Sequence, residues 1–588
     1  MAKTSRDMKI TLLDASEVAR LLSDRDRLAE WEQLARACPW TTAYQTPAFA
    51  RAWYAVYGPA FAPLIAEGRA PNGALVGLLA LALGRRNQEV VAVGAPHAPY
   101  QGWIATPAAS DFILGALAAC GRELSVDQLT LQYLPKGTPL DWMHRMRGGV
   151  RLAMRAVRRG LVSLDGLTIE TSLQNDLNGA RLRRLTQHGP VRLETLRTQR
   201  ELEAVIGEIA AQCDLHQAAR TGGRPFRDDP RTRQLYLKMI DEPGLLHAAV
   251  LKIGDTVAAS HLGVINGASV SLGLVTCSPA HAARSPRELL LLLLARQLYD
   301  EGYRVLDLNP GDDEARDRFA THFDRVHALT VFLRRRAYAR HAVAGLAARA
   351  PHRTGIDLTG VVSRVSEMRR RLGSQGLTPV LLAALQGRLA RGWSLREFRM
   401  YGLPASEVPK TESGADLRRD AIDDLLLYRP LSANEMTLKD FLAEAVRRLE
   451  EGQHVYTFAA DGVLRHYSWL IERTERAGSD FGHAFALPGP AAVLWSDYTW
   501  PDARGHGLQT RSIHRRLRDA AAAGHARIFI GVRAENAVSR HNIEKVGFAH
   551  WASGWAEYRF GRVKRWITYA QMGAAPEAAA LAAQPAWK

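Results

Sequence analysis

The feature that most constrains the fold is a glycine-containing turn, Arg504–Gln509, between an extended apolar segment and an amphipathic segment. Residues 491–498 are rich in aliphatic and aromatic side chains, which predicts a buried β-strand. Beyond the turn, apolar residues recur at helical spacing over residues 513–521. A strand that passes through glycines into a helix directs several backbone N–H groups, and the positive end of the helix dipole, at one point. The sequence therefore predicts an α/β unit with a phosphate-binding turn.

The residues downstream of the turn strengthen this interpretation. Residues 527–532 are predicted to form a second strand, and Asn536 is a favoured N-cap residue for a short helix after it. Gly547 stands where the end of that helix requires a positive φ. Two further strands are predicted at 555–560 and 563–569. The order strand, turn, helix, strand, helix, hairpin is thus predicted for the last third of the chain.

Two motifs in this region resemble those of the GNAT superfamily of acyl-CoA N-acyltransferases. Arg504-x-x-Gly507-x-Gln509 is similar to the Arg/Gln-x-x-Gly-x-Gly/Ala pyrophosphate loop except at its last position. Asn536-x-x-Ser539, followed by the segment 544–548 (Glu-Lys-Val-Gly-Phe), is similar to the ending of that family. The resemblance covers about residues 425–572 and implies that acetyl-CoA binds there as the acyl donor, without a metal. The implied donor-binding residues are Tyr498, Arg504, Gly505, His506, Gly507, Leu508, Gln509, Asn536 and Ser539.

The catalytic residues expected from this resemblance are Asp497 and Tyr558. Backbone N–H groups near Asp497 and Tyr498 would polarise the thioester carbonyl, and the Asp497 carboxylate would accept the proton of the acceptor. The alternative for Asp497 is a solvated carboxylate at a strand end. The position at which many family members place a tyrosine acid holds Ile543, so Tyr558 or a water would have to replace it. Loss of turnover with retained binding is therefore one of the open interpretations.

The first two thirds of the chain resemble the CelD-like acetyltransferases, a two-lobed branch related to the FemAB peptidyltransferases. The resemblance spans about residues 40–340. It rests on five short elements in the expected order: Gln45–Pro47 with Trp53, Asn178 with Arg183 and Gly189, Phe226–Pro230, Ser285–Leu290, and Asp307–Asp312. Arg287 and Arg316 depart from the family pattern. A second site at Ser285, Arg287 and Asp307 is one interpretation, and a helix cap with a structural aspartate is the other; His216 and His261 are either bases or structural residues.

Length and resemblance together predict the fold class. A chain of 588 residues is too long for one hydrophobic core. We expect an α/β (α+β) protein of three GNAT-like mixed β-sheet lobes with flanking helices, joined by a helical connector. The predicted boundaries are a first support lobe at 1–168, a second lobe at 169–345, a connector at 346–424, a C-terminal acyl-CoA-binding domain at 425–575 and a flexible tail at 576–588.

Composition restricts the environment and the partners. The four cysteines, Cys38, Cys120, Cys213 and Cys277, are scattered, which argues against a disulfide framework or structural zinc and favours the cytoplasm. No signal peptide is visible, and the run 289–294 is too short to span a membrane. The net charge of +17 is better explained by arginines on solvated helix faces, and it also permits weak contact with an anionic membrane or tRNA.

Three functions remain compatible with the sequence. The first is an acetyl-CoA-dependent N- or O-acetyltransferase, which by resemblance would serve cell-envelope or exopolysaccharide metabolism. The second is a FemAB-like peptidyltransferase that uses aminoacyl-tRNA. The third is a non-catalytic scaffold that binds acyl-CoA. The acceptor, whether a small molecule, a glycan or a protein, is not fixed by any residue, and neither is the oligomeric state.

Overall fold

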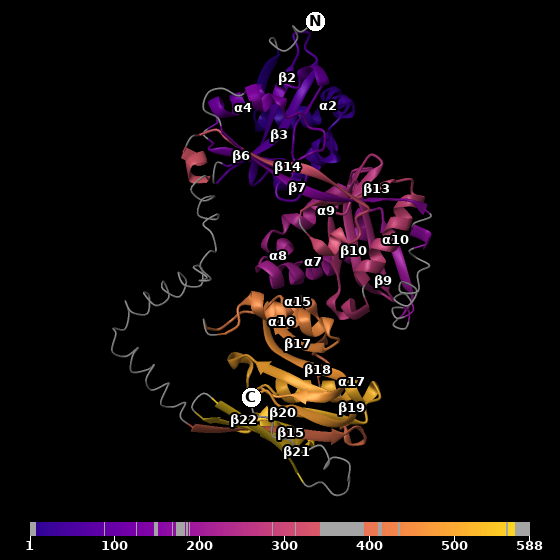
Figure 1. Ribbon diagram of the computed structural model, residues 1–588, viewed down its shortest axis with the longest axis vertical. Helices are drawn as coiled ribbons and strands as arrows, with labels where there is room; N and C mark the ends of the chain where they lie inside the picture. The colour runs from indigo at the N-terminus through magenta and orange to yellow at the C-terminus, as the bar shows by residue number, and fades with distance from the viewer. Residues whose placement is uncertain are drawn as a thin grey trace, which may run out of the picture. The chain divides into compact units, whose positions relative to one another are not determined.

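We describe the protein from a computed structural model (Figure 1). The structure describes residues 8–341 and 393–570, apart from gaps at 87–88, 125, 146–150, 167–168, 172–182, 184–185, 187–188, 285, 312, 335, 410–413, 433–434 and 560–561. The chain divides into two compact units, residues 1–217 with 223–350, and residues 351–588 with 218–222. The described residues form a mixed α/β protein with three β-sheets, which confirms the predicted fold class.

The first sheet is antiparallel, in the order β1-β2-β3-β4, with β5 also beside β3. Its strands are β1 (Lys9–Leu13), β2 (Phe61–Arg69), β3 (Leu75–Gly84), β4 (Val90–Ala92) and β5 (Ile104–Ala105). The flanking helices are α1 (Ala15–Ser23), α2 (Arg25–Ala37), α3 (Pro47–Tyr57) and α4 (Phe112–Glu123). Trp31, Trp53 and Trp103 are fully buried in the core of this lobe.

The second sheet has the order β6-β14-β7-β13-β11-β10-β9-β8, with β12 beside β10. Its strands are β6 (Gln128–Leu134), β7 (Arg151–Ser163), β8 (Val191–Leu196), β9 (Leu246–Ile253), β10 (Thr256–Asn266), β11 (Ser269–Ser271), β12 (Leu274–Cys277), β13 (Val305–Pro310) and β14 (His322–Phe332). Helices α7 (Gln199–Thr221), α8 (Pro225–Asp228), α9 (Arg231–Asp241) and α10 (Pro286–Asp300) accompany it. The strands β6 and β7 come from residues 128–163, assigned to the first lobe from the sequence, yet they pair with β13 and β14. Alternation of apolar residues identifies a strand but not the sheet it joins.

The third sheet has the order β16-β17-β18-β19-β20-β15-β21-β22. Its strands are β15 (Trp393–Pro404), β16 (Arg418–Arg419), β17 (His454–Ala460), β18 (Val463–Gly478), β19 (Ala484–Thr499), β20 (Arg527–Arg533), β21 (Ala549–Arg559) and β22 (Arg562–Tyr569). Residues 393–404, predicted as part of the helical connector, instead form β15 between β20 and β21. Phe398 and Met400 on this strand are buried two residues apart, which is the period of a strand rather than of a helix.

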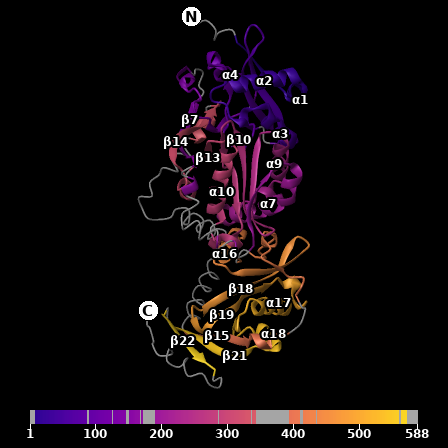
Figure 2. The ribbon, with the colours of Figure 1, turned by 90° about the vertical axis from the view of Figure 1, so that its right-hand side faces the viewer.

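Helices cover both faces of the third sheet. Side chains of α15 (Ile422–Leu425) and α16 (Leu438–Glu450) meet one face, as shown by the hydrogen bond from Thr457 Oγ1 to Asp424 Oδ2 (2.6 Å). The helices α17 (Leu508–Ala522) and α18 (Ala537–Val546) lie side by side on the other face (Figure 2). Ser468 on β18 and Ser512 on α17 join their hydroxyls there, 2.5 Å apart. Successive residues of β18 therefore face different helices.

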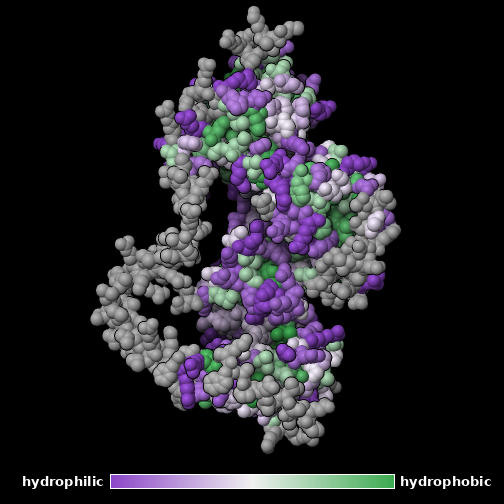
Figure 3. Space-filling view, in the orientation of Figure 1, coloured by the Kyte–Doolittle hydropathy of each residue, from purple (hydrophilic) through white to green (hydrophobic). Residues whose placement is uncertain are grey.

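Some sequence expectations fall on residues that the structure does not describe. These are Asn178, Ser285, Asp312, residues 346–392 of the predicted helical connector and the tail at 576–588. None of the helices in the described part of the chain is long and apolar enough to cross a membrane. The face of the molecule in Figure 3 is largely hydrophilic, with hydrophobic side chains in scattered patches. Several arginines are paired with carboxylates, such as Arg336 with Asp127 (3.1 Å) and Arg399 with Glu397 (2.9 Å).

Candidate functional site

The C-terminal lobe contains two parallel strands that part from one another. The strands β19 and β20 pair only from Ala492 to Leu494, against Ile528 to Ile530. Both continue beyond this point, β19 to Thr499 and β20 to Arg533. At Ser496 the backbone adopts a φ of 50°, and the pairing of β19 with β18 shifts register there. Such an irregularity leaves backbone groups without ladder partners, so they are available to a ligand between the strands.

The predicted phosphate loop lies at the start of α17. Gly505 (φ 84°) and Gly507 (φ 70°) both have left-handed backbone, and Gly507 is the N-cap residue of the helix without a side-chain cap. A Cβ atom at either glycine would meet nothing within 4 Å, so the loop is open to a ligand. Arg504 donates from Nε to the carbonyl oxygen of Thr499 (3.1 Å), which ties the loop to the end of β19. The first N–H groups of α17 are free of intrahelical partners and suit an anion.

Three predicted donor-binding residues meet where α17 and α18 begin. Gln509 donates from Nε2 to the hydroxyl of Ser539 (2.7 Å) and accepts from Asn542 Nδ2 (3.0 Å). Asn536 caps α18 by accepting from the backbone N–H of Ser539 (3.2 Å). Gln509, which departs from the glycine of the family pattern, therefore links the two helix N-termini. Sequence reasoning could not connect residues thirty positions apart through one side chain.

Asp497 lies at the parting of the strands, but its carboxylate already has a partner. Its Oδ1 is 2.5 Å from Nη2 of Arg516 on α17, whose side chain is completely buried. Arg516 also donates from Nη1 to the carbonyl oxygen of Trp469 (2.9 Å). Burial raises the pKa of Asp497 and lowers the pKa of Arg516, and their mutual attraction opposes both shifts. The side chain of Asp497 is 14% exposed and faces the helix rather than solvent.

The structure does not bring Tyr558 to Asp497. Tyr558 lies on β21, and β20 and β15 separate that strand from β19. Three inter-strand steps place the two strands at least about 14 Å apart. The guanidinium of Arg396 lies 5.6 Å from the centre of the Tyr558 ring. Ile543, at the position implied for a tyrosine acid, is buried in the apolar core.

Sequence reasoning missed a carboxylate beside Tyr498. The Tyr498 hydroxyl donates to Oε1 of Glu435 (3.3 Å), which comes from the loop before α16. The Tyr498 ring stacks on Tyr467 at 5.8 Å between centroids and meets Trp500 edge-on at 4.9 Å. Burial and Glu435 raise the pKa of Tyr498, while Arg504 partly opposes them. No motif marked Glu435, because it reaches Tyr498 only through folding.

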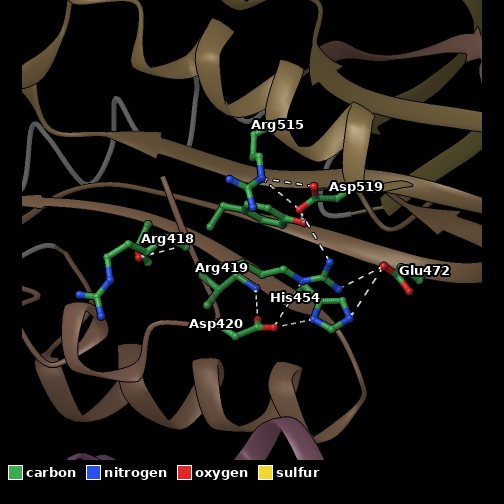
Figure 4. A network of polar contacts seen from close by, with 10 residues as sticks. Arg418, Arg419, Asp420, His454, Glu472, Arg515 and Asp519 are labelled. Carbon is green, nitrogen blue, oxygen red and sulfur yellow. Dashed lines mark hydrogen bonds and ion pairs between the residues drawn. The ribbon is translucent and has the colours of Figure 1, made fainter. Parts of the chain in front are cut away.

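A polar network holds α17 to the edge of the sheet (Figure 4). Arg419 on β16 extends its guanidinium between Asp420 (3.6 Å), Glu472 (3.4 Å) and Asp519 (3.7 Å). The Tyr456 hydroxyl donates to Asp519 Oδ2 (2.7 Å). Since Asp519 lies on α17, these contacts fix the helix that carries the phosphate loop.

The second lobe has a similar parting of strands. The strand β11 pairs in parallel with β13, whereas β12 pairs only with β10, and Gly273 (φ 54°) lies at the break between them. Asp307 in the middle of β13 is buried, accepts a hydrogen bond from the Tyr100 hydroxyl (2.5 Å) and lies 3.4 Å from Arg159. Burial raises the pKa of Asp307. The helix α10 begins with Pro286, which has no N–H, so its N-terminus offers fewer donors to an anion than that of α17.

The histidines singled out in the second lobe are held by structural contacts. His261 faces His247, 3.4 Å between their Nδ1 atoms, and its Nε2 lies 3.2 Å from the carbonyl oxygen of Ser271. Burial lowers the pKa of His261 to about 3. His216 lies with Nε2 3.0 Å from the carbonyl oxygen of Cys277. Within the described residues, no group of three or more His, Cys, Asp or Glu side chains is placed to hold a metal ion.

One segment of the chain matches the model of a known protein family. Residues 179–319, within the second lobe, match the family model described as acetyltransferase (GNAT) domain. The chain carries a GNAT acetyltransferase domain. The matched residues include Asp307 but not the Arg504–Gln509 loop, which lies in the C-terminal lobe. No curated protein matches the chain.

Several solved structures are similar over about half of the chain. FemX is 8% identical over 53% of this chain and 97% of its own, with a TM-score of 0.40. L-PGS from Bacillus licheniformis is 13% identical over 55% of this chain and 97% of its own, with a TM-score of 0.34. A tandem GNAT protein from the clavulanic acid biosynthesis pathway is 14% identical over 55% and 98%, with a TM-score of 0.32.

Proposed function

We propose that the protein is an acyl-CoA-dependent acyltransferase that moves an acetyl group from acetyl-CoA to an amine or hydroxyl acceptor. The donor site is assigned to the Arg504–Gln509 loop of the C-terminal lobe. The observation that carries this proposal is the open loop with two left-handed glycines at the uncapped start of α17, directly beside the point where β19 and β20 part. The GNAT domain of the second lobe supports the reaction class.

Different residues of this site are proposed to bind different parts of the donor. Backbone N–H groups of Gly505–Leu508 would hold the pyrophosphate, since they combine with the positive end of the α17 dipole. Gln509 joins the N-terminus of α17 to that of α18, and Asn536 caps α18. The backbone of residues 496–498 would polarise the thioester carbonyl, because this segment continues beyond Leu494, where the pairing with β20 ends. The thioester supplies the activated acyl group.

The two predicted catalytic residues have different places in this proposal. Asp497 holds Arg516 beneath the parted strands and so positions the backbone that follows it. Tyr558 lies too far from β19 to act on the same acyl group. A second candidate function, binding of acyl-CoA without turnover, is favoured by the engaged Asp497 and by the buried Ile543.

Two glycines that flank α17 provide a matched test of the donor site. Gly507 precedes the helix and Gly524 (φ 85°) follows it, and a Cβ atom at either would meet open space. Gly→Ala at each position costs about 1 kcal/mol of backbone strain. We expect Gly507→Ala to weaken acetyl-CoA binding in calorimetry at least about 10-fold, corresponding to about 1.4 kcal/mol, while Gly524→Ala binds as the wild type does. Equal affinities for all three proteins would refute the assignment of the loop.

A further inference from the structure

A short loop before α16 lies against the end of β19 on the sheet face opposite α17. Glu435 in this loop accepts from the Tyr498 hydroxyl (3.3 Å) and from the backbone N–H of Leu431 (2.6 Å). Tyr498 is two residues beyond Ser496, where the backbone of β19 breaks its register. The Glu435–Tyr498 pair therefore lies beside the point at which a thioester carbonyl would be polarised.

The two sheet faces differ in the groups they offer. On the α17 face, Asp497 is bound to the buried Arg516, so its carboxylate is engaged. On the opposite face, Tyr498 and Glu435 are both half-exposed, so an incoming molecule can reach them. Arg504 of the phosphate loop is near enough to Tyr498 to act on its hydroxyl electrostatically. The pair thus adjoins the proposed donor site while remaining open to a second substrate.

The loop does not depend on this pair for its anchoring. Tyr428 donates from its hydroxyl to the carbonyl oxygen of Met436 (3.0 Å), and Trp500 donates from Nε1 to that of Arg429 (3.3 Å). These bonds hold both ends of the loop through Tyr428 and Trp500, whose rings meet edge-on at 5.5 Å between centroids. The Glu435–Tyr498 bond is therefore an additional contact between two ionisable groups at the mouth of the site.

We propose that Glu435 and Tyr498 are the base and the acid of the transfer and that the acceptor is a primary amine with an apolar substituent. This inference rests on the proposed function. Leu431 (56% exposed) and Met436 (44% exposed) flank Glu435 in the same loop and offer apolar surface to such a substituent. A carboxylate at the mouth also favours an amine over a neutral alcohol, because the amine arrives from water as an ammonium ion.

The proton balance of this step closes within the pair. The ammonium ion first releases one proton to solvent water. The neutral amine nitrogen then forms a bond to the thioester carbonyl carbon, and the C–S bond breaks. One amine proton passes to the carboxylate of Glu435, and the hydroxyl proton of Tyr498 passes to the leaving thiolate. Protonated Glu435 then returns its proton to the Tyr498 phenolate along their hydrogen bond. The products are an amide and a free thiol, and both side chains are restored.

The test uses the full chain with acetyl-CoA, 2-phenylethylamine and butylamine, with 2-phenylethanol as the hydroxyl counterpart. Thiol release gives kcat, and calorimetry gives the Kd of acetyl-CoA. We expect Glu435→Gln and Tyr498→Phe each to lower kcat with the amines by about 100-fold, the range of acid–base catalysis. Their Kd for acetyl-CoA should stay that of the wild type, because the donor contact proposed for residue 498 comes from its backbone, and an unchanged Kd also shows that the variants fold. Glu450→Gln and Tyr569→Phe, in the same unit, make the same chemical changes away from the pair and should leave kcat unchanged.

The outcomes separate the two proposals. A wild type that does not bind acetyl-CoA contradicts the proposed function itself. Binding without thiol release from either amine, a preference for 2-phenylethanol, or full kcat in both single variants contradicts the Glu435–Tyr498 pair and leaves the donor site standing. Because the two groups act as one unit, the double variant should be no slower than the slower single variant. A double variant slowed by the product of the two effects overturns the shared proton path.

Discussion

The buried ion pair between Asp497 and Arg516 gives the most quantitative prediction for the C-terminal lobe. Replacing Arg516 with Met removes the positive charge that contacts Asp497 and a donor to the carbonyl oxygen of Trp469. Methionine fills most of the vacated volume, so the cost comes from the uncompensated carboxylate. Breaking a buried pair from one side destabilises a protein by about 3–5 kcal/mol. We expect the free energy of unfolding of this lobe to fall by that amount.

The control is the double variant Asp497→Leu with Arg516→Met, which removes both charges and so leaves no buried charge without a partner. Replacing both members of a buried pair by apolar residues is often nearly neutral, so the double variant should recover most of the loss. Native-state hydrogen exchange, followed by mass spectrometry on peptides from β19 and α17, measures the unfolding free energy of this lobe within the full chain. A single variant within about 1 kcal/mol of the wild type, or a double variant no more stable than the single one, would refute the reasoning.

Three further predictions concern residues around the site. Gln509→Ala leaves the Ser539 hydroxyl without its donor and should cost about 2 kcal/mol and weaken acetyl-CoA binding; an unchanged Kd would contradict its role as a link between helices. Burial lowers the pKa of His466 to about 3, so the unfolded state takes up the proton first, and stability falls by about 1.4 kcal/mol for each pH unit from 6.5 down to about 3. Urea titrations of His466→Gln should lack this contribution to the slope. Asp519→Asn weakens the bond from Tyr456 and should increase hydrogen exchange in α17, and unchanged exchange would count against the network as its anchor.

The sequence anticipates the elements around the donor loop well. The strand before it, the helix after it and the cap at Asn536 follow from local chemistry: apolar runs, helical spacing and a side chain that bonds to the backbone three residues on. Gly547 is left-handed, as its place at the C-terminal end of α18 requires. These features depend on neighbours within about ten residues, so a single sequence carries them.

Long-range pairing explains what the sequence could not show. Residues 393–404 were expected in a connector, yet they insert between β20 and β21, because the order of strands in a sheet depends on partners more than a hundred residues away. Asp497 looks like a strand-end carboxylate until Arg516, one helix later, is placed against it. Glu435 carries no motif, and its position beside Tyr498 emerges only from the path of the loop before α16.

The most direct test of the central claim is hydrogen exchange of the full chain with and without acetyl-CoA. The account predicts that acetyl-CoA slows exchange of the backbone N–H groups of residues 505–511, at the start of α17, where the uncapped donors lie. Residues 286–290, at the start of α10 in the second lobe, should exchange at the same rate in both conditions. Protection confined to α10, with none at α17, would contradict the assignment of the donor site to the C-terminal lobe.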